Sequence, residues 1–125
     1  MAAQGAFVPS DGLAIEIERI ASLSADARRR LATMDVGNVT FVVGDGSLGS
    51  PGHAPFDRIL SAAASPSVPA PWVSQLSEGG IIVLPVGDRY EQALTRVTLR
   101  RGRTESEVFG GCRFVPLIGM YGFHR

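Results

Sequence analysis

The feature that most constrains the fold of this chain is the apolar run Ile81-Ile82-Val83-Leu84-Pro85-Val86. The run is short, rich in β-branched residues and preceded by Glu78-Gly79-Gly80. Such a run is typical of a strand that is buried on both faces. Strands of this kind belong to parallel sheets that are covered by helices, so the run predicts an α/β fold.

The rest of the chain supplies further elements of such a sheet. Apolar or β-branched segments predict strands at 13–18, 38–43 and 56–61, and helical patterns predict helices at 20–34 and 71–76. Ser22 or Ser24 would cap the longer helix, and its Arg28-Arg29-Arg30 run is interpreted as a solvated face rather than an anion site. Residues 44–55 and 62–69 are predicted to be loops.

Two alternating segments near the end of the chain change the pattern. Ala93–Leu99 and Glu105–Phe109, joined by Arg101-Gly102-Arg103, predict an antiparallel pair at the edge of the sheet. The chain is thus predicted to form a single α/β domain over residues 1–125. Its sheet would be mostly parallel, with an antiparallel edge hairpin.

Composition argues against several classes of protein and site. Twelve basic and twelve acidic residues cancel, which argues against binding to nucleic acid or to an anionic membrane. No apolar run reaches the roughly 18 residues that a membrane span needs. Cys112 is the only cysteine, and no signal peptide is recognised at the N-terminus, so we expect a cytoplasmic protein. His53 and His124 lie far from Cys112 in the sequence and predict no metal site.

Two acidic residues follow predicted parallel strands. Glu18 ends the first strand, and Asp45 follows the second in a loop that contains Gly44, Gly46 and Gly49. Because the carboxyl ends of parallel strands meet at one edge of a sheet, Glu18 would suit ribose hydroxyls and Asp45 an exocyclic amine, with Gly46 leaving room for a flat ring. Each carboxylate also has a structural alternative. Glu18 would then be a solvated strand end or a first-turn helix residue, and Asp45 the aspartate of an Asx turn.

Several short motifs follow one another in a characteristic order. They are Ile17-Glu18-Arg19-Ile20, Gly44-Asp45-Gly46-Ser47-Leu48-Gly49, Ala54-Pro55-Phe56-Asp57-Arg58-Ile59, Ala62-Ala63-Ala64, Gly79-Gly80, Leu84-Pro85-Val86-Gly87-Asp88 and Arg113-Phe114-Val115-Pro116-Leu117. In order and spacing they resemble the protein-L-isoaspartate O-methyltransferase family. Each motif is moderately specific, but the ordered set, which covers roughly residues 6–119, is highly specific.

The resemblance implies a Rossmann-like fold that binds S-adenosylmethionine. It implies methyl transfer from that cofactor to the α-carboxylate of isoaspartyl residues in damaged proteins. By the family pattern, Glu18 would hold the ribose hydroxyls, and Asp45 and Gly46 the adenine. A C-terminal segment would lie near the substrate peptide and the cofactor, largely through its backbone: Phe114, Val115, Pro116, Leu117 and Ile118.

Two parts of the family pattern have no counterpart in these residues. They are the glycine-rich loop that wraps the methionine part of the cofactor and an upstream serine segment, so no catalytic residue is assigned. By resemblance, the chain corresponds to the C-terminal two thirds of a family member, with Met1–Val8 as the end of the helix after that loop. The first central strand would lie between the strands that end at Glu18 and Ser61. We therefore expect weak cofactor binding or none by this chain alone, and a chain that is marginally stable, self-associating or completed by another segment.

Two other functions remain open at this point. The chain could be a catalytically inactive remnant that serves as a binding or interaction module through exposed strand edges. It could also be a nucleotide-binding enzyme of another chemistry that has kept the adenosine half-site.

Overall fold

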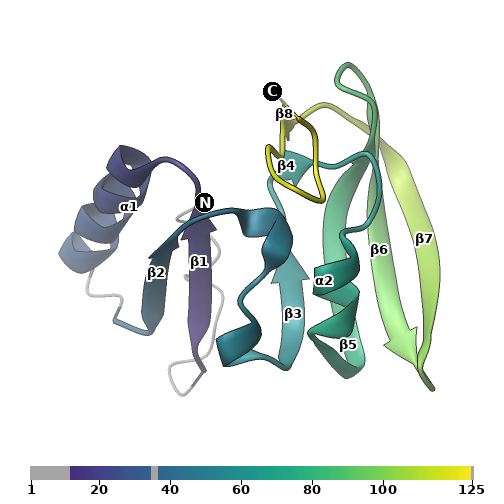
Figure 1. The fold of residues 1–125 in the computed structure, drawn as a ribbon, viewed down its shortest axis with the longest axis horizontal. Coiled ribbons are helices and arrows are strands. Elements are labelled where there is room, and N and C mark those ends of the chain that lie inside the picture. The colour runs from purple at the N-terminus through teal and green to yellow at the C-terminus, as the bar shows by residue number, and fades with distance from the viewer. Residues whose placement is uncertain (1–11, 35–36, 125) are drawn as a thin grey trace. The chain divides into compact units, whose positions relative to one another are not determined.

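The computed structural model describes residues 12–34 and 37–124, which fall into two compact units, one up to Gly46 and one from Ser47 onward. Met1–Val8, interpreted above as the end of a helix, lies outside the described residues. The helices and strands of both units are labelled in Figure 1. The single domain predicted over residues 1–125 stays a prediction.

The first unit is a strand–helix–strand arrangement. Strand β1 (Ala14–Glu18) runs parallel to β2 (Val39–Val43), and helix α1 (Ala21–Thr33) connects them. The register pairs Ala14 with Val39 and Glu18 with Val43, so both strands end at the same edge. These elements confirm the two strands and the helix predicted in this part of the chain.

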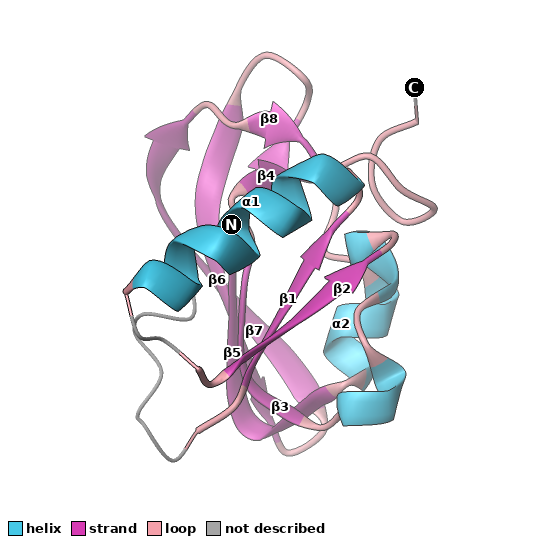
Figure 2. Ribbon diagram, turned by 90° about the vertical axis from the view of Figure 1, so that its left-hand side faces the viewer, coloured by secondary structure: helices cyan, strands magenta, loops and turns pink. Residues whose placement is uncertain are grey.

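Helix α1 lies against the β1–β2 pair through one face (Figure 2). Its buried residues are Ser24, Ala27 and Leu31, spaced three and four apart as one helical face requires. Neither predicted serine cap is correct: the N-cap residue is Ile20, with no side-chain capping bond, because the helix begins before Ser22. The arginine run is exposed, as the sequence predicted.

The second unit contains a four-stranded sheet in the order β3-β5-β6-β7. The first pair is parallel and the other two are antiparallel. The elements of this unit are β3 (Phe56–Leu60), β4 (Ala63–Ala64), α2 (Ala70–Ser74), β5 (Leu76–Gly87), β6 (Gln92–Arg100), β7 (Arg103–Cys112) and β8 (Val115–Pro116). Parallel pairing followed by antiparallel pairing at the edge agrees with the predicted fold class.

Two segments of this unit differ from the prediction. The 71–76 helix and the following glycine loop were expected to precede a strand at Ile81, but α2 ends at Ser74 and β5 already begins at Leu76. The strand can start early because Leu76 pairs with Phe56 of β3, and an irregular register before Arg58 accommodates the extra residues.

Residues 62–69 were predicted to be a loop, yet they contain β4. Ala63 and Ala64 pair in parallel with Val115 and Pro116 of β8. The pairing joins segments about fifty residues apart, so no local pattern in the small, proline-bearing stretch could reveal it.

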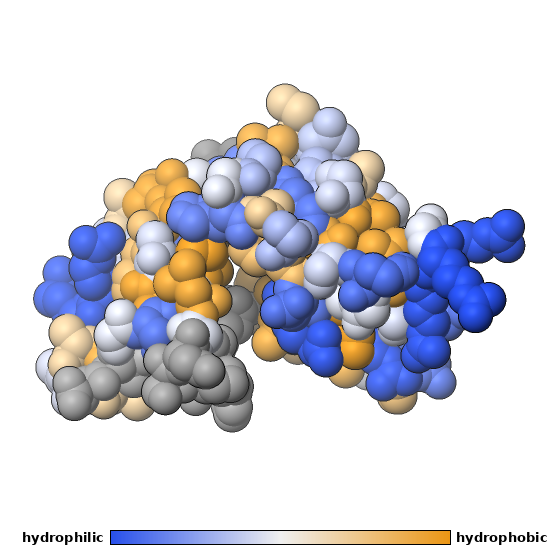
Figure 3. Space-filling model, turned by 90° about the horizontal axis from the view of Figure 1, so that it is seen from below, coloured by the Kyte–Doolittle hydropathy of each residue, from blue (hydrophilic) through white to orange (hydrophobic). Residues whose placement is uncertain are grey.

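The predicted hairpin is confirmed, with a tighter turn than expected. Arg101 and Gly102 form the turn between β6 and β7 with φ angles of 54° and 72°. Positive φ at both central residues is characteristic of a type I′ turn, which matches the twist of the strands. The Glu78 carboxylate accepts the Arg101 N–H at 2.7 Å. Hydrophilic side chains gather at this end of the unit (Figure 3).

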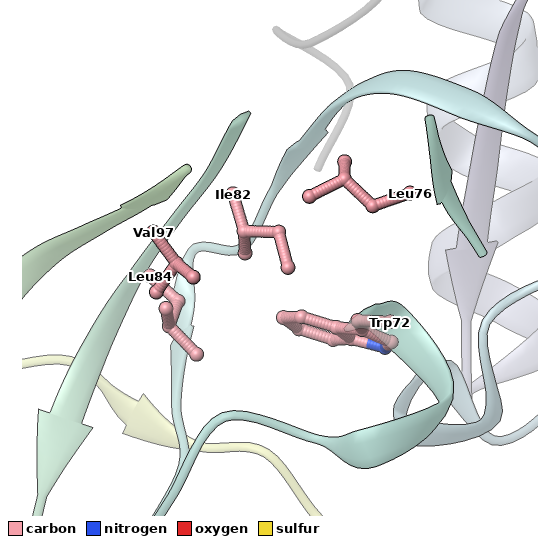
Figure 4. Close-up of a cluster of buried hydrophobic side chains, with 5 residues drawn as sticks. All are labelled: Trp72, Leu76, Ile82, Leu84 and Val97. Carbon is pink, nitrogen blue, oxygen red and sulfur yellow. The ribbon is translucent and has the colours of Figure 1, made fainter. Parts of the chain in front are cut away.

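The core of the second unit lies between α2 and the sheet. Its buried residues are Trp72, Leu76, Ile82, Leu84 and Val97 (Figure 4). Trp72 of α2 faces the β5 side chains Ile82 and Leu84, which are fully buried. Burial of β5 on both faces was predicted, but its alternate residues, Ile81 and Val83, are only half-buried. One face is covered by α2, while the other is partly open in the described part of the chain.

Every end strand of the described sheets has a partner on one side alone, and two of these end strands, β1 and β3, matter for the predicted missing strand. Within the described residues, β1 pairs only with β2, and β3 pairs only with β5. Each therefore presents backbone N–H and C=O groups along one edge, which is a surface for a further strand.

Candidate functional site

The candidate ligand residues of the first unit lie together at the carboxyl ends of β1 and β2. Glu18 ends β1, and Asp45 follows β2 by two residues. The Gly44 N–H donates to the Glu18 carbonyl at 3.0 Å, which joins the two strand ends. The structure therefore brings Glu18 and the Asp45–Gly46 loop to one edge, as the sequence predicted.

Glu18 is half-buried, and its carboxylate has a structural partner. Its Oε1 accepts the backbone N–H of Ile20, the N-cap residue of α1, at 3.1 Å. Of the two predicted structural alternatives, Glu18 is therefore a strand end and not a first-turn helix residue, since it precedes the N-cap residue Ile20 by two positions. A carboxylate has about four acceptor positions, so this bond leaves capacity for ribose hydroxyls. The two roles are compatible.

The backbone has free space beside it at Gly44. Asp45 and Gly46 are half-buried, and Gly46 begins a short 3-10 helix, Gly46–Leu48. A Cβ added at Gly44 would meet no atom within 4 Å, so there is free space beside this backbone. This space is compatible with the adenosine part of S-adenosylmethionine, while the roles of Glu18 for the ribose and of Asp45 and Gly46 for the adenine stay predictions.

The second unit holds the loop that follows this site. Gln75, only 8% exposed, accepts the Ser50 N–H through Oε1 at 2.9 Å and donates from Nε2 to the Leu48 carbonyl at 2.9 Å. The buried Ser47 hydroxyl accepts the Tyr121 N–H at 3.1 Å. Three residues of the glycine-rich motif and its continuation are thus fixed by side-chain hydrogen bonds.

The candidate peptide segment, Phe114–Ile118, belongs to the second unit. Phe114 donates its N–H to Gln92 Oε1 at 2.8 Å, and Leu117 donates its N–H to the Ala64 carbonyl at 2.7 Å. Val115 and Pro116 form β8. These two backbone donors are used inside the protein, while the side chains of Phe114 and Val115 are exposed by 38% and 70%.

Sequence reasoning missed the two buried glutamines that organise these loops. Gln75 and Gln92 each bond two backbone groups, and Gln92 is only 3% exposed. Glutamine is usually a surface residue, so neither position carried a signal. The strongest available hint was that Gln92 opens an alternating strand at a position where an apolar residue would face the core.

The remaining candidates behave as loop or surface residues. His53 Nδ1 lies 2.8 Å from the Ser50 hydroxyl, a contact within the loop. Among the described residues, no three histidine, cysteine, aspartate or glutamate side chains gather in a metal-binding arrangement. None of the helices in that same part of the chain is both long and apolar enough to cross a membrane.

Comparison with known proteins agrees with this geometry. A family model described as protein-L-isoaspartate(D-aspartate) O-methyltransferase matches residues 2–122. The protein-L-isoaspartate O-methyltransferase of Dictyoglomus turgidum is 46% identical over 107 residues, covering 86% of this chain and 49% of that protein. That of Methanoculleus marisnigri is 44% identical over 109 residues, with coverages of 87% and 50%. The chain spans about half the length of the curated relatives it matches.

Solved structures show the same fold. One protein-L-isoaspartate O-methyltransferase superposes with a TM-score of 0.81 at 27% identity, covering 91% of this chain and 37% of that one. Another, from Plasmodium falciparum in complex with S-adenosyl-L-homocysteine, has a TM-score of 0.74 at 20% identity, with coverages of 85% and 52%. The α/β sheet described above, mostly parallel with an antiparallel edge, is therefore Rossmann-like. The chain belongs to the protein-L-isoaspartate(D-aspartate) O-methyltransferase family.

Proposed function

We propose that this chain carries the adenosine half of an S-adenosylmethionine site and a peptide-binding segment for the methylation of isoaspartyl residues in damaged proteins. The observation that carries the proposal is the placement of Glu18 and the Asp45–Gly46 loop at the joined ends of β1 and β2. Family membership supports the chemistry. The relatives' names support the substrate class.

The reaction makes modest demands on the protein. When bound, S-adenosylmethionine supplies a methyl group that its sulfonium already activates. A substrate carboxylate with a pKa of about 4 is ionised at neutral pH, so no general base is needed. The work of this chain is to bind and orient. Glu18 would hold the ribose, Asp45 and Gly46 would hold the adenine, and Phe114, Val115, Pro116, Leu117 and Ile118 would lie along the peptide.

Titration with adenosine tests the half-site directly. We expect adenosine to shift the backbone amide signals of Glu18 and Asp45, and S-adenosylmethionine to bind little more tightly, because the chain has no assigned partner for the methionine part. Asp45→Ala should weaken adenosine binding by roughly tenfold, the worth of one good polar contact. The matched control is Asp26→Ala, on α1 of the same unit. Equal affinities of the two variants, or no binding by the native chain, would overturn the adenine assignment.

A second experiment tests the substrate class. A peptide that contains isoaspartate should bind more tightly than the same peptide with ordinary aspartate, with signal changes in residues 114–118. Methyl transfer to the isoaspartyl peptide by this chain is expected to be slow unless the sheet is completed. Equal binding of the two peptides would argue against the proposed substrate.

We also propose that the open edges of β1 and β3 are covered by a further strand, from another segment or from a second copy of the chain. Unpaired edges favour such association. Sedimentation measurements should show self-association that a completing segment suppresses. A stable monomer with a cooperative melt at high temperature would contradict this. The open edges also favour the alternative of an inactive interaction module, which the adenosine titration distinguishes.

The proposed compartment is the cytoplasm. A chain with one cysteine, Cys112, forms no internal disulfide, and Cys112 is free in the structure. Fractionation of cells that express the native gene tests this placement.

A further inference from the structure

A buried hydroxyl directly follows the candidate adenine residues. Ser47 comes after Asp45 and Gly46 and is the middle residue of the short 3-10 helix Gly46–Leu48. It is completely buried, with an exposed fraction of 0%. Its Oγ accepts the backbone N–H of Tyr121 at 3.1 Å, and the two residues lie 74 positions apart in the sequence. Ser47 therefore attaches a C-terminal loop to the residues that follow the candidate adenine position.

The C-terminal loop that contains Tyr121, residues 117–123, is closed at its base. The Phe123 N–H donates to the Leu117 carbonyl at 2.7 Å, and the Gly119 N–H donates to the Phe123 carbonyl at 3.1 Å. Each end of the loop is thus bonded to the other. A loop closed in this way is a compact unit, so a displacement of Tyr121 would disturb its other bonds as well.

The C-terminal loop is also anchored to the sheet and has little free space. The Leu117 N–H donates to the carbonyl of Ala64 in β4 at 2.7 Å. A Cβ added at Gly122 would lie only 2.3 Å from the Leu117 carbonyl oxygen. Tyr121, by contrast, is 42% exposed, and it is its backbone N–H that meets Ser47. The attachment therefore depends on the Ser47 hydroxyl and on the path of the loop backbone.

The far end of the helix Gly46–Leu48 is held by a different side chain. Gln75 Nε2 donates to the Leu48 carbonyl at 2.9 Å, and Gln75 Oε1 accepts the Ser50 N–H at 2.9 Å. These bonds do not involve the C-terminal loop. Loss of the bond between Ser47 and Tyr121 would therefore loosen the beginning of the helix, next to the candidate adenine residues, more than its end.

We infer that Ser47 is a positioning residue for the nucleoside: through its bond to Tyr121, the ordered C-terminal loop and an adenosine ligand stabilise each other. This role rests on the proposed function and deepens it, because it adds a residue that acts without touching the ligand. A ligand that fixes Asp45 and Gly46 also restricts Ser47, which is the next residue. The restricted hydroxyl then keeps its bond to the Tyr121 N–H.

The size of the effect follows from the bond. Linkage requires that whatever factor adenosine gains from the ordered loop, the loop gains from adenosine. One neutral hydrogen bond corresponds to roughly a fivefold change in an equilibrium constant. Adenosine affinity and the opening of the loop should therefore each change by about that factor.

Hydrogen exchange of the native chain, with and without saturating adenosine, is the first test. We expect adenosine to slow exchange of the Tyr121 amide by roughly fivefold. The internal control is the Arg101 amide, which donates to Glu78 at 2.7 Å in the β6–β7 hairpin and should change less. If adenosine shifts the Glu18 and Asp45 signals but slows both amides equally, or slows neither, the inference is wrong and the proposed function stands. If adenosine shifts neither signal, both are overturned.

Two serine variants then test the hydroxyl. Ser47→Ala should weaken adenosine binding roughly fivefold, and adenosine should no longer slow the Tyr121 amide although it still shifts the Asp45 signal. Ser65→Ala is the matched control. Ser65 is also completely buried, but its hydroxyl makes no hydrogen bond within the described residues, so this variant should behave like the native chain.

A Ser47→Ala chain that binds adenosine as tightly as Ser65→Ala, or that still shows the slowing at Tyr121, would overturn the inference. The exchange measurement on the native chain decides the matter if Ser47→Ala is too unstable to titrate.

Discussion

The backbone N–H of Phe114 donates to Oε1 of Gln92 at 2.8 Å, and Gln92 is almost completely buried. The other end of the same amide donates from Nε2 to the Asp88 carbonyl at 2.7 Å. A single side chain therefore fixes both the turn after β5 and the first residue of the proposed peptide segment.

Replacing Gln92 with methionine should destabilise the chain. Methionine has a similar volume but leaves the Phe114 N–H and the Asp88 carbonyl without their partner. One buried polar group without a partner costs about 1–3 kcal/mol of unfolding free energy. Urea denaturation measures the loss, and hydrogen exchange at the Phe114 amide should become faster. An unchanged exchange rate at Phe114 would show that Gln92 does not hold the segment.

Replacing Gly49 with alanine should also be costly. Gly49 has φ of +67°, and an added Cβ would lie 2.2 Å from Gln75 Oε1. We expect a loss of about 1–3 kcal/mol, from left-handed backbone strain and displacement of Gln75. Gly52→Ala is the matched control, since a Cβ there meets no atom within 4 Å. Equal melting temperatures of the two variants would contradict the prediction.

A cavity in the core of the second unit should strongly destabilise the chain. Leu84 is fully buried in contact with the Trp72 cluster, so Leu84→Ala should lower the unfolding free energy by about 2–5 kcal/mol. Val108→Ala on the edge strand β7 is the control, because Val108 is 62% exposed. Chemical denaturation of both variants gives the comparison. A small effect of Leu84→Ala would mean that the core collapses to fill the space.

The hydrogen bonds of the Asp88 carboxylate should make the unfolding free energy depend on pH. The Tyr90 N–H, and then the Glu91 N–H, hold the pKa of the Asp88 carboxyl below its ordinary value. A lowered pKa in the folded state means that this contribution is present above the unfolded pKa of about 3.9 and is lost as the pH falls through the folded value. Asp88→Asn removes the titration. The stability difference between wild type and Asp88→Asn should therefore shrink below about pH 4, and a difference that is constant down to pH 2.5 would refute it.

Much of the fold was predictable because its elements have local signals. The β-branched run before Gly44 predicts β2, and the four-residue spacing of Ala27 and Leu31 predicts the buried face of α1. Glycine next to Arg101 predicts the hairpin turn. Parallel pairing then follows from the alternation of strand and helix, and it brings Glu18 and Asp45 to one edge.

The sequence by itself determined the two helices, the main strands and which carboxylates stand at the strand ends. Only the tertiary structure decided that Ala63 and Ala64 pair with β8, that Leu76 already belongs to β5, and that Gln75 and Gln92 are buried between loops. The physical reason is the distance along the sequence over which each interaction acts. Periodicity and turn chemistry act over a few neighbouring residues, whereas these hydrogen bonds join groups 20 or more residues apart and form only when packing excludes water from them.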